Sequence, residues 1–256
     1  MLKAVIFDMD DTLVDWSARK QDWRRYEREH LRRVFDYVVR DVYPLRDFEA
    51  FFQTAQNCFI DAWADADRHL HAPHLGRALV ETLLALGIPP ERLDADACLR
   101  AYDWGVMPDV TLYPDVPDTL ALLRKAGLRL GLVTNAFAPM RLRDRELAQL
   151  GLPPETFDCR LSSADAGYLK PHPAIFEAAL DCLGVRSDEA VFVGDSLETD
   201  IAGAQSVGMR GVLRTGPEAP APSDGLSTSP DAVIVTLADL PAVLDAWYPG
   251  WGGSTR

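Results

Sequence analysis

The residues best suited to chemistry are three carboxylates within four positions, Asp8, Asp10 and Asp11. They directly follow the apolar run 4–7, whose Val, Ile and Phe residues predict a buried strand. Acids at the carboxyl end of a strand lie where open α/β sheets bind their ligands. Two carboxylates ~4 Å apart repel by about 1 kcal/mol in water and by several times that at an effective dielectric constant near 20. We therefore expect a bound cation, Mg²⁺, which prefers oxygen ligands, and the alternative is a solvated acidic turn.

Further polar residues stand where later apolar runs end or where a helix begins. The runs 128–133 and 190–193 predict strands, and each is followed at once by such residues. Side chains at the carboxyl ends of these strands belong to the ligand-binding edge of the sheet, as Asp8 does. The residues are, in chain order, Thr134, Asn135, Lys170, Asp195 and Asp200.

The second half of the chain alternates strand patterns with helical ones. Glycine stands at several of the predicted helix ends, as at Gly127 and Gly184. This alternation predicts an α/β fold with a doubly wound, Rossmann-like parallel sheet. We expect strands at 128–133, 157–162, 190–193, 212–213 and 232–235, helices at 118–127, 141–150, 173–183, 199–207 and 238–247, a loop at 215–230 and a mobile tail after 247.

Residues 15–107 show helical periodicity and almost no strand pattern. Large apolar residues recur at three- and four-residue steps, and Pro108 and Pro114 mark the exit. The chain therefore divides into a core, residues 1–14 and 108–256, and an inserted all-helical domain, residues 15–107. Within the insertion we expect helices at 16–38, 48–63, 75–86 and 94–104, and a loop at 69–74.

The segment Asp8-Met9-Asp10-Asp11-Thr12-Leu13 resembles the first motif of the haloacid dehalogenase superfamily, Asp-x-Asp-x-Thr behind a hydrophobic strand. Thr134-Asn135, Lys170-Pro171 and the segment 194–200 match the three later motifs of that family in order. The resemblance covers residues 1–14 and about 108–245, nearly the whole core. It implies that the helical insertion is a cap domain that closes over the site.

Two positions depart from the common pattern of this family. Asp11 stands where many members have Gly or Asn, and Thr199 precedes Asp200 where many have Asn. Neither departure removes a group that the chemistry requires.

The resemblance implies a phosphatase in which Asp8 is the nucleophile and forms an aspartyl-phosphate. Mg²⁺ would be held by Asp8, Asp195 and the backbone carbonyl of Asp10. Asp200 would act close to the metal or orient Lys170. The Lys170 ammonium would screen the charge of Asp8 and stabilise the transferring oxygens.

Thr134 and Asn135 complete the expected site. The Thr134 hydroxyl and nearby backbone N–H groups would hold the phosphoryl group, and Asn135 would line the same pocket. Phosphoryl transfer spreads negative charge over three equatorial oxygens, so catalysis consists mainly of positioning and electrostatic stabilisation.

Asp10 has a distinct expected role as general acid and base. A phosphate ester leaves as an alkoxide and needs a proton, yet an ordinary Asp side chain is protonated in only about one molecule per thousand at pH 7. We expect acidic neighbours to favour the protonated form of Asp10, so that it protonates the leaving group. It would then deprotonate the water that attacks the aspartyl-phosphate.

Three other functions are weighed against the phosphatase. Family members that displace a halide need no general acid or divalent metal and generally lack the second Asp of the first motif, so Asp10 argues against a 2-haloacid dehalogenase. A phosphomutase stays open, because the cap decides whether water or a sugar hydroxyl receives the phosphoryl group. A non-catalytic binding or regulatory protein also stays open, although the changes at Asp8, Lys170 or Asp195 that would favour it are absent.

Composition restricts the partners. The formal net charge of −13 argues against nucleic-acid backbones and anionic membranes, but a local cation still permits a small phosphorylated metabolite. No apolar run approaches the ~20 residues of a membrane span, and the chain enters its first strand with no signal-peptide pattern. We expect a cytoplasmic protein, and the sequence does not predict its oligomeric state.

Three further groups of residues are interpreted as structural. The cysteines are far apart in the sequence and form no Cys-x-x-Cys pair, so we expect reduced thiols. Three clustered histidines lack an acid or cysteine at ligand spacing and are expected in a solvated loop. Arginines of the first inserted helix are expected on a solvated face, with contact to a substrate anion as the alternative. The residues are Cys58, Cys98, Cys159 and Cys182, His69, His71 and His74, and Arg19, Arg24 and Arg25.

Overall fold

The structure is a computed structural model and describes all residues except 20–21, 217–228 and 254–256. Most of the predicted loop at 215–230 and the last part of the predicted mobile tail therefore lie outside the described residues.

Six strands of the described chain form one sheet, in the order β5-β4-β1-β6-β7-β8, and all neighbours are parallel. In chain order this is the 3-2-1-4-5-6 arrangement of doubly wound sheets, so the predicted α/β, Rossmann-like fold is confirmed. The order reverses between β1 and β6, and such switch points are where these folds bind ligands. The strands are β1 (Ala4–Phe7), β4 (Arg129–Thr134), β5 (Cys159–Ser162), β6 (Ala190–Gly194), β7 (Arg210–Arg214) and β8 (Ala232–Ile234).

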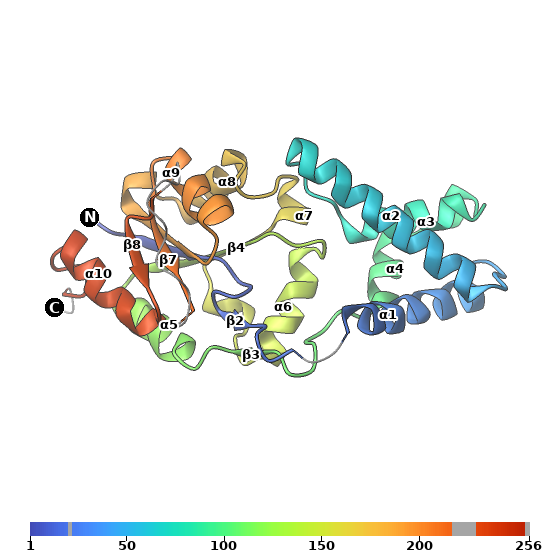
Figure 1. Cartoon of the computed structure of the whole chain (residues 1–256), viewed down its shortest axis with the longest axis horizontal. Helices are drawn as coiled ribbons and strands as arrows, with labels where there is room; N and C mark the ends of the chain where they lie inside the picture. The colour runs from blue at the N-terminus through green and yellow to red at the C-terminus, as the bar shows by residue number, and fades with distance from the viewer. Residues whose placement is uncertain (20–21, 217–228, 254–256) are drawn as a thin grey trace.

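Helices cover both faces of this sheet (Figure 1). Successive side chains of a strand point to opposite faces, so Val5 and Phe7 pack in one apolar core and Ala4 and Ile6 in another. Helices α5, α6 and α10 contribute to the first core, and α8 and α9 to the second. The helices are α5 (Val116–Lys125), α6 (Met140–Gln149), α7 (Ser163–Ala166), α8 (Pro173–Leu183), α9 (Gly203–Ser206) and α10 (Leu240–Trp247).

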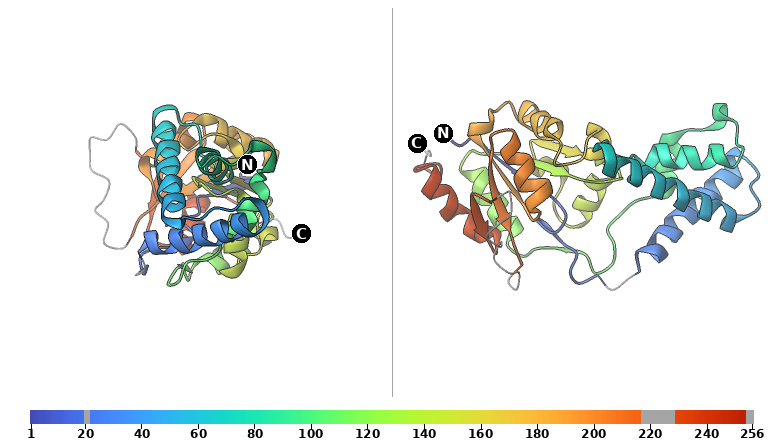
Figure 2. Two further views of the ribbon diagram at one scale, coloured as in Figure 1. Left: turned by 90° about the vertical axis from the view of Figure 1, so that its right-hand side faces the viewer. Right: turned by 45° about the horizontal axis from the view of Figure 1, so that its top comes forward.

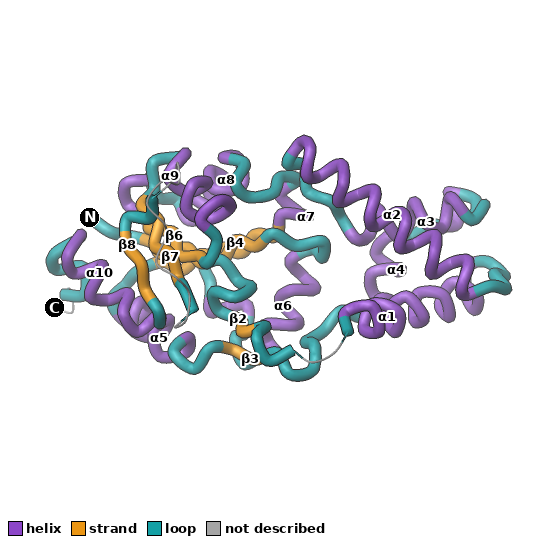
Figure 3. Tube along the Cα trace, viewed as in Figure 1, coloured by secondary structure: helices purple, strands orange, loops and turns teal. Residues whose placement is uncertain are grey.

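A helical bundle is inserted between β1 and β4 and extends away from the sheet (Figures 1 and 3). The first inserted helix begins at Trp23 rather than near residue 16, because the Asp22 side chain accepts a hydrogen bond from Arg24 N and caps the helix there. A short π-helix, η1 (Val38–Val42), extends it. The helices are α1 (Trp23–Tyr37), α2 (Phe48–His69), α3 (Leu75–Ala85) and α4 (Ala95–Tyr102).

The two chain segments that connect the bundle to the sheet pair with each other. β2 (Val14–Asp15) and β3 (Thr111–Leu112) form a short antiparallel ladder. The sequence did not predict these strands, because two residues are too few to show a periodicity.

The bundle also contacts loops at the carboxyl edge of the sheet (Figure 2). Leu169 N donates to Leu70 O at the end of α2, over 2.9 Å, and Leu75 N at the start of α3 donates to Phe137 O, also over 2.9 Å. The inserted helices are therefore hydrogen-bonded directly to the residue before Lys170 and to the loop that follows β4.

One expectation about the cysteines is wrong. The structure joins Cys159 of β5 to Cys182 of α8 in a disulfide, because packing of α8 on the sheet brings their Cα atoms to 5.9 Å. Sequence separation alone does not show this contact. Cys58 and Cys98 are free thiols, as expected.

Among the described residues, no helix has the length and apolar character needed to cross a membrane.

Candidate active site

The carboxyl end of β1 places Asp8 at the centre of a buried charged group. Asp8 N donates to Val193 O of β6, which holds the residue between the two strands at the switch point. Lys170 Nζ lies 2.5 Å from Asp8 Oδ1 and 2.6 Å from Asp200 Oδ1. All three residues are buried, so one lysine is shared between two carboxylates that are largely shielded from water.

The local structure explains how Lys170 and Asp200 reach these places. The Asn135 side-chain amide bonds to both backbone groups of Lys170. Its Oδ1 accepts from Lys170 N at 2.8 Å, and its Nδ2 donates to Lys170 O at 3.0 Å. Asp200 Oδ2 accepts a hydrogen bond from Ser196 N, 3.0 Å away, which folds the segment after β6 back on itself. A Cβ at Gly194 would lie only 2.4 Å from the Asp200 carboxyl, so glycine is required there.

Burial and charge set the protonation preferences of this group. Burial raises the pKa of Asp8 well above its ordinary value, Lys170 lowers it, and the carboxylates of Asp200 and Asp10 raise it further. Burial lowers the pKa of Lys170, but the carboxylates of Asp200 and Asp8 outweigh it and raise the pKa above the ordinary lysine value. Lys170 therefore stays charged at neutral pH, as a fixed cation beside Asp8.

Three acids of this group form a cluster suited to a divalent cation. Asp8, Asp195 and Asp200 each place one carboxylate oxygen within 4.8 Å of the others. Partial burial, with the nearby carboxylates of Asp200 and Asp11, raises the pKa of Asp195 to about 6, although its side chain remains open to solvent. Hard oxygen donors with one side open to water fit Mg²⁺, which keeps several water ligands.

Asp10 lies beside this cluster, and three side chains from other parts of the chain bond to its carboxylate. Its Oδ1 accepts from Trp16 Nε1 at 2.9 Å and from Arg143 Nη2 at 2.5 Å, and its Oδ2 accepts from Thr134 Oγ1 at 3.3 Å. The sequence analysis considered only acidic neighbours of Asp10, and the structure adds the buried guanidinium of Arg143. The role of Asp10 as general acid and base stays a prediction. Metal binding through the Asp10 backbone carbonyl stays a prediction.

Arg143 belongs to a chain of contacts that the sequence analysis did not find. Its Nη1 lies 2.9 Å from Glu146 Oε2, which also accepts from Trp104 Nε1 over 2.8 Å. Arg143 and Glu146 are both buried, and both lie on the stripe of α6 that faces the core with Met140 and Leu147. The sequence did carry a signal for this buried ion pair, because an Arg and a Glu stand three positions apart on an otherwise apolar helix stripe.

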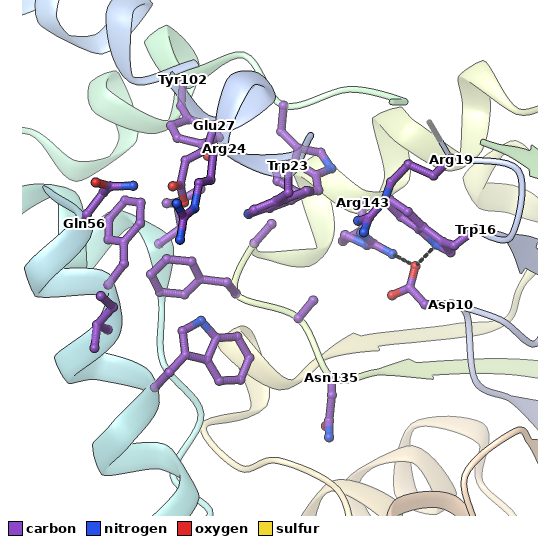
Figure 4. A pocket seen from close by; sticks show the side chains of 18 of the residues that line it. Asp10, Trp16, Arg19, Trp23, Arg24, Glu27, Gln56, Tyr102, Asn135 and Arg143 are labelled. Atoms are coloured by element: carbon purple, nitrogen blue, oxygen red, sulfur yellow. Dashed lines mark hydrogen bonds and ion pairs between the residues drawn. The ribbon is translucent and has the colours of Figure 1, made fainter. Parts of the chain in front are cut away.

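A cavity of about 810 Å³ opens next to Asp10, between the sheet edge and the inserted helices. Figure 4 shows Asn135, Asp10, Trp16 and Arg143 at one end of it. Asn135 thus lines the pocket, as expected, while its amide is also bonded to the backbone of Lys170.

The inserted arginines and histidines have different surroundings. Arg19 and Arg24 line the cavity, whereas Arg25 is exposed and pairs with Glu29. His74 caps α3 by accepting from Gly76 N, and the described residues place no histidine in a group of convergent metal ligands. His69 is the last residue of α2, and His71 and His74 lie between α2 and α3, so the expected loop at 69–74 begins one residue later than predicted.

Comparison with known proteins gives one consistent family. Residues 2–208 match the family model described as a hydrolase, haloacid dehalogenase-like hydrolase. A glyceraldehyde 3-phosphate phosphatase of Methanopyrus kandleri is 32% identical over 82% of both chains. A ribulose-1,5-bisphosphate 5-phosphatase of Halopiger xanaduensis is 32% identical over 83% of this chain and 84% of the relative, and an N-acylneuraminate-9-phosphatase of Rattus norvegicus is 27% identical over 96% and 94%.

Solved structures agree with this comparison at the level of the fold. A 2-haloacid dehalogenase from Pseudomonas syringae matches with a TM-score of 0.62 and 27% identity, over 96% of this chain and all of the other. A HAD phosphatase from Thermococcus onnurineus matches with a TM-score of 0.57 and 26% identity, over 95% and 98%.

Proposed function

Because the chain belongs to the haloacid dehalogenase-like hydrolase family, we propose that it is a Mg²⁺-dependent phosphatase acting on a small-molecule phosphate monoester. Residues 1–14 and 108–256 would form the catalytic core, and residues 15–107 the cap. The curated relatives named above are phosphatases of small phosphorylated metabolites, which supports this reaction class.

The observation that carries the proposal is the pairing of Lys170 with Asp8 and Asp200, next to the exposed carboxylate of Asp195. A phosphate dianion approaching Asp8 meets repulsion from every acid nearby. A fixed cation and a metal at the Asp8, Asp195 and Asp200 oxygens would together offset this repulsion. Bound Mg²⁺ would supply Lewis-acid stabilisation of the phosphoryl oxygens.

In the first step, a carboxylate oxygen of Asp8 attacks phosphorus as the ester P–O bond breaks, which gives an aspartyl-phosphate and an alkoxide. Asp10 gives its proton to that alkoxide, so an alcohol leaves. The Thr134 hydroxyl, already 3.3 Å from Asp10 Oδ2, would hold a phosphoryl oxygen, and Lys170 would offset the charge that spreads over the oxygens.

In the second step, ionised Asp10 takes a proton from water, and the oxygen of that water attacks phosphorus. The bond between phosphorus and Asp8 breaks, which releases inorganic phosphate and regenerates the Asp8 carboxylate and protonated Asp10. Trp16 and Arg143 hold Asp10 Oδ1 and would fix the direction from which the water attacks.

Dehalogenation is the second candidate, because a 2-haloacid dehalogenase has the same fold at 27% identity. Halide displacement also needs a nucleophile at Asp8, but it needs no divalent metal and so gives no cation-binding task to the carboxylates gathered at positions 8, 195 and 200. Phosphoryl transfer uses all of them, and we therefore prefer it.

The test is phosphate release from a panel of small phosphomonoesters, with Mg²⁺ and with EDTA, using the native protein and Asp8→Asn. We expect metal-dependent release that the substitution abolishes, and a phosphorylated Asp8 peptide after acid quench. Halide release from a 2-haloacid without phosphate release would overturn the proposal. Conversion of a sugar phosphate to its isomer, in place of phosphate release, would establish a mutase instead.

A further inference from the structure

The cavity beside Asp10 continues far beyond the space that a phosphoryl group needs. Figure 4 shows it extending from Asp10 and Arg143 to Gln56 in the inserted helices, and its volume is about 810 Å³. Pockets of roughly 300–1,000 Å³ hold ligands of drug size. A three-carbon phosphate would leave most of this space to water, so the volume indicates a larger leaving group.

Two sets of aromatic rings line the cavity. Trp23 of α1 and Trp104 form the first set, with ring centroids 5.8 Å apart. Phe59 and Trp63 of α2 form the second set around Phe137, at 5.0 and 6.0 Å. Within the described part of the chain, no recorded ring contact joins one set to the other, although both face the same cavity. Aromatic rings that line a cavity favour a planar group that stacks on them.

The end of the cavity remote from Asp10 is polar. Glu27 and Gln56 line the cavity there, and Arg24 lies beside Glu27 (Figure 4). A plain hydrocarbon ring would cover these groups without bonding to them, and buried polar groups left unpaired cost free energy. The planar group that fits here therefore carries hydrogen-bond donors and acceptors on its edge.

We propose that the substrate is a phosphate monoester whose alcohol carries a planar, hydrogen-bonding heterocycle, the chemistry of a nucleoside 5′-monophosphate. The phosphate would lie at Asp8, the heterocycle between the two aromatic sets, and its edge against Glu27 and Gln56. This inference rests on the proposed phosphatase function. It goes beyond the named relatives, whose substrates contain no such ring.

The test compares ribose 5-phosphate with uridine and adenosine 5′-monophosphates, because each nucleotide adds a base to the same sugar phosphate. We expect kcat/KM with Mg²⁺ to be about 5- to 150-fold higher for at least one nucleotide, the range that aromatic stacking of one base supplies. Trp63→Leu should lower kcat/KM for that nucleotide more than for ribose 5-phosphate. Trp247→Leu, on α10 and outside the cavity, is the matched control and should change neither.

Binding is measured separately, by calorimetry of the nucleotides with Asp8→Asn and with the native protein. Equal or better turnover of ribose 5-phosphate would overturn the heterocycle inference while the phosphatase function stands. Hydrolysis of other phosphomonoesters but of no nucleotide would overturn it as well. Nucleotide binding without hydrolysis of any ester would support the cavity assignment and overturn the phosphatase function.

Discussion

Replacing Arg143 tests whether the contacts beneath Asp10 serve catalysis or only folding. Arg143 joins Asp10 at 2.5 Å to Glu146 at 2.9 Å, and Glu146 in turn accepts from Trp104. Arg143→Met keeps an unbranched apolar side chain in place of the arginine stem and removes the charged guanidinium. The double variant Arg143→Met with Glu146→Gln removes both charges of the buried pair and keeps an acceptor for Trp104.

The two variants should differ in stability. The Glu146 side chain is fully buried and that of Arg143 is 5% exposed, whereas the Asp10 side chain is 33% exposed and can be solvated. Arg143→Met leaves the Glu146 carboxylate buried and unpaired, a defect that costs about 3–5 kcal/mol. Removal of both charges is close to neutral in comparable cases, so the double variant should recover most of the free energy of unfolding. Urea unfolding measures both values.

The two variants should share one catalytic defect. General acid–base catalysis contributes ~10²–10⁴-fold, and Asp10 keeps the hydrogen bond from Trp16, so we expect about a 10- to 100-fold loss of kcat. With p-nitrophenyl phosphate the leaving group needs no proton, so the loss falls on attack of water on the aspartyl-phosphate. Stopped-flow absorbance should then show a burst of p-nitrophenol in both variants, followed by slow turnover.

Two results would refute this reasoning. If kcat of Arg143→Met stays within about threefold of the native value, Arg143 does not orient Asp10. If the double variant recovers kcat together with stability, the loss in the single variant came from partial unfolding. Asp10→Asn is the reference for complete loss of the acid–base function and should reduce kcat by more than either variant.

Three further predictions follow from single contacts. Gly194→Ala should destabilise the fold by about 1–3 kcal/mol and lower kcat, because the added methyl group must displace the Asp200 carboxyl. Gly216→Ala, whose added Cβ would have no atom of the described residues within 4 Å, is the control for urea unfolding and turnover. Asn135→Ala should lower kcat by up to about 100-fold with a smaller change in KM, because it frees the backbone of Lys170; an unchanged kcat would contradict this role. Burial lowers the pKa of His30, so the unfolded chain binds a proton at this residue more readily than the folded one. The free energy of unfolding is therefore unaffected by this proton above about pH 6.5 and decreases as the pH falls through the folded pKa, by at most ~1.4 kcal/mol per pH unit. Urea unfolding of His30→Gln between pH 5 and 8 should lack this part of the pH dependence.

The sequence predicted the residues whose position follows from the strands. Asp8 and Thr134 stand at strand ends, and parallel strands bring their carboxyl ends to one edge, so their proximity follows from the fold. The α/β class and the helical insertion were also predicted, because both depend on periodicities that extend over many residues. The predicted ends of helices were less accurate where a single capping side chain decides them, as at the start of α1.

The contacts around Asp10 that the sequence analysis missed join segments through side chains rather than through regular backbone pairing. Arg143 lies 133 positions from Asp10, and Trp104 lies 42 positions from Glu146. No periodicity encodes such pairs. The disulfide between β5 and α8 belongs to the same class, because only the packing of the helix on the sheet reveals it.

The contacts beneath Asp10 give the inserted helices a physical connection to the chemistry. Trp16 lies in the segment that enters the bundle and Trp104 in the segment that leaves it, and both are linked by hydrogen bonds to Asp10, one directly and one through Glu146 and Arg143. The loop before Lys170 is likewise bonded to the end of α2. A shift of the helices over a bound ester would therefore move the groups that hold Asp10, the proposed acid–base residue, together with those that hold Lys170. The cavity between the inserted helices is thus connected by hydrogen bonds to the groups around Asp10 and Lys170. Substitutions among the cavity aromatics should therefore change kcat as well as KM.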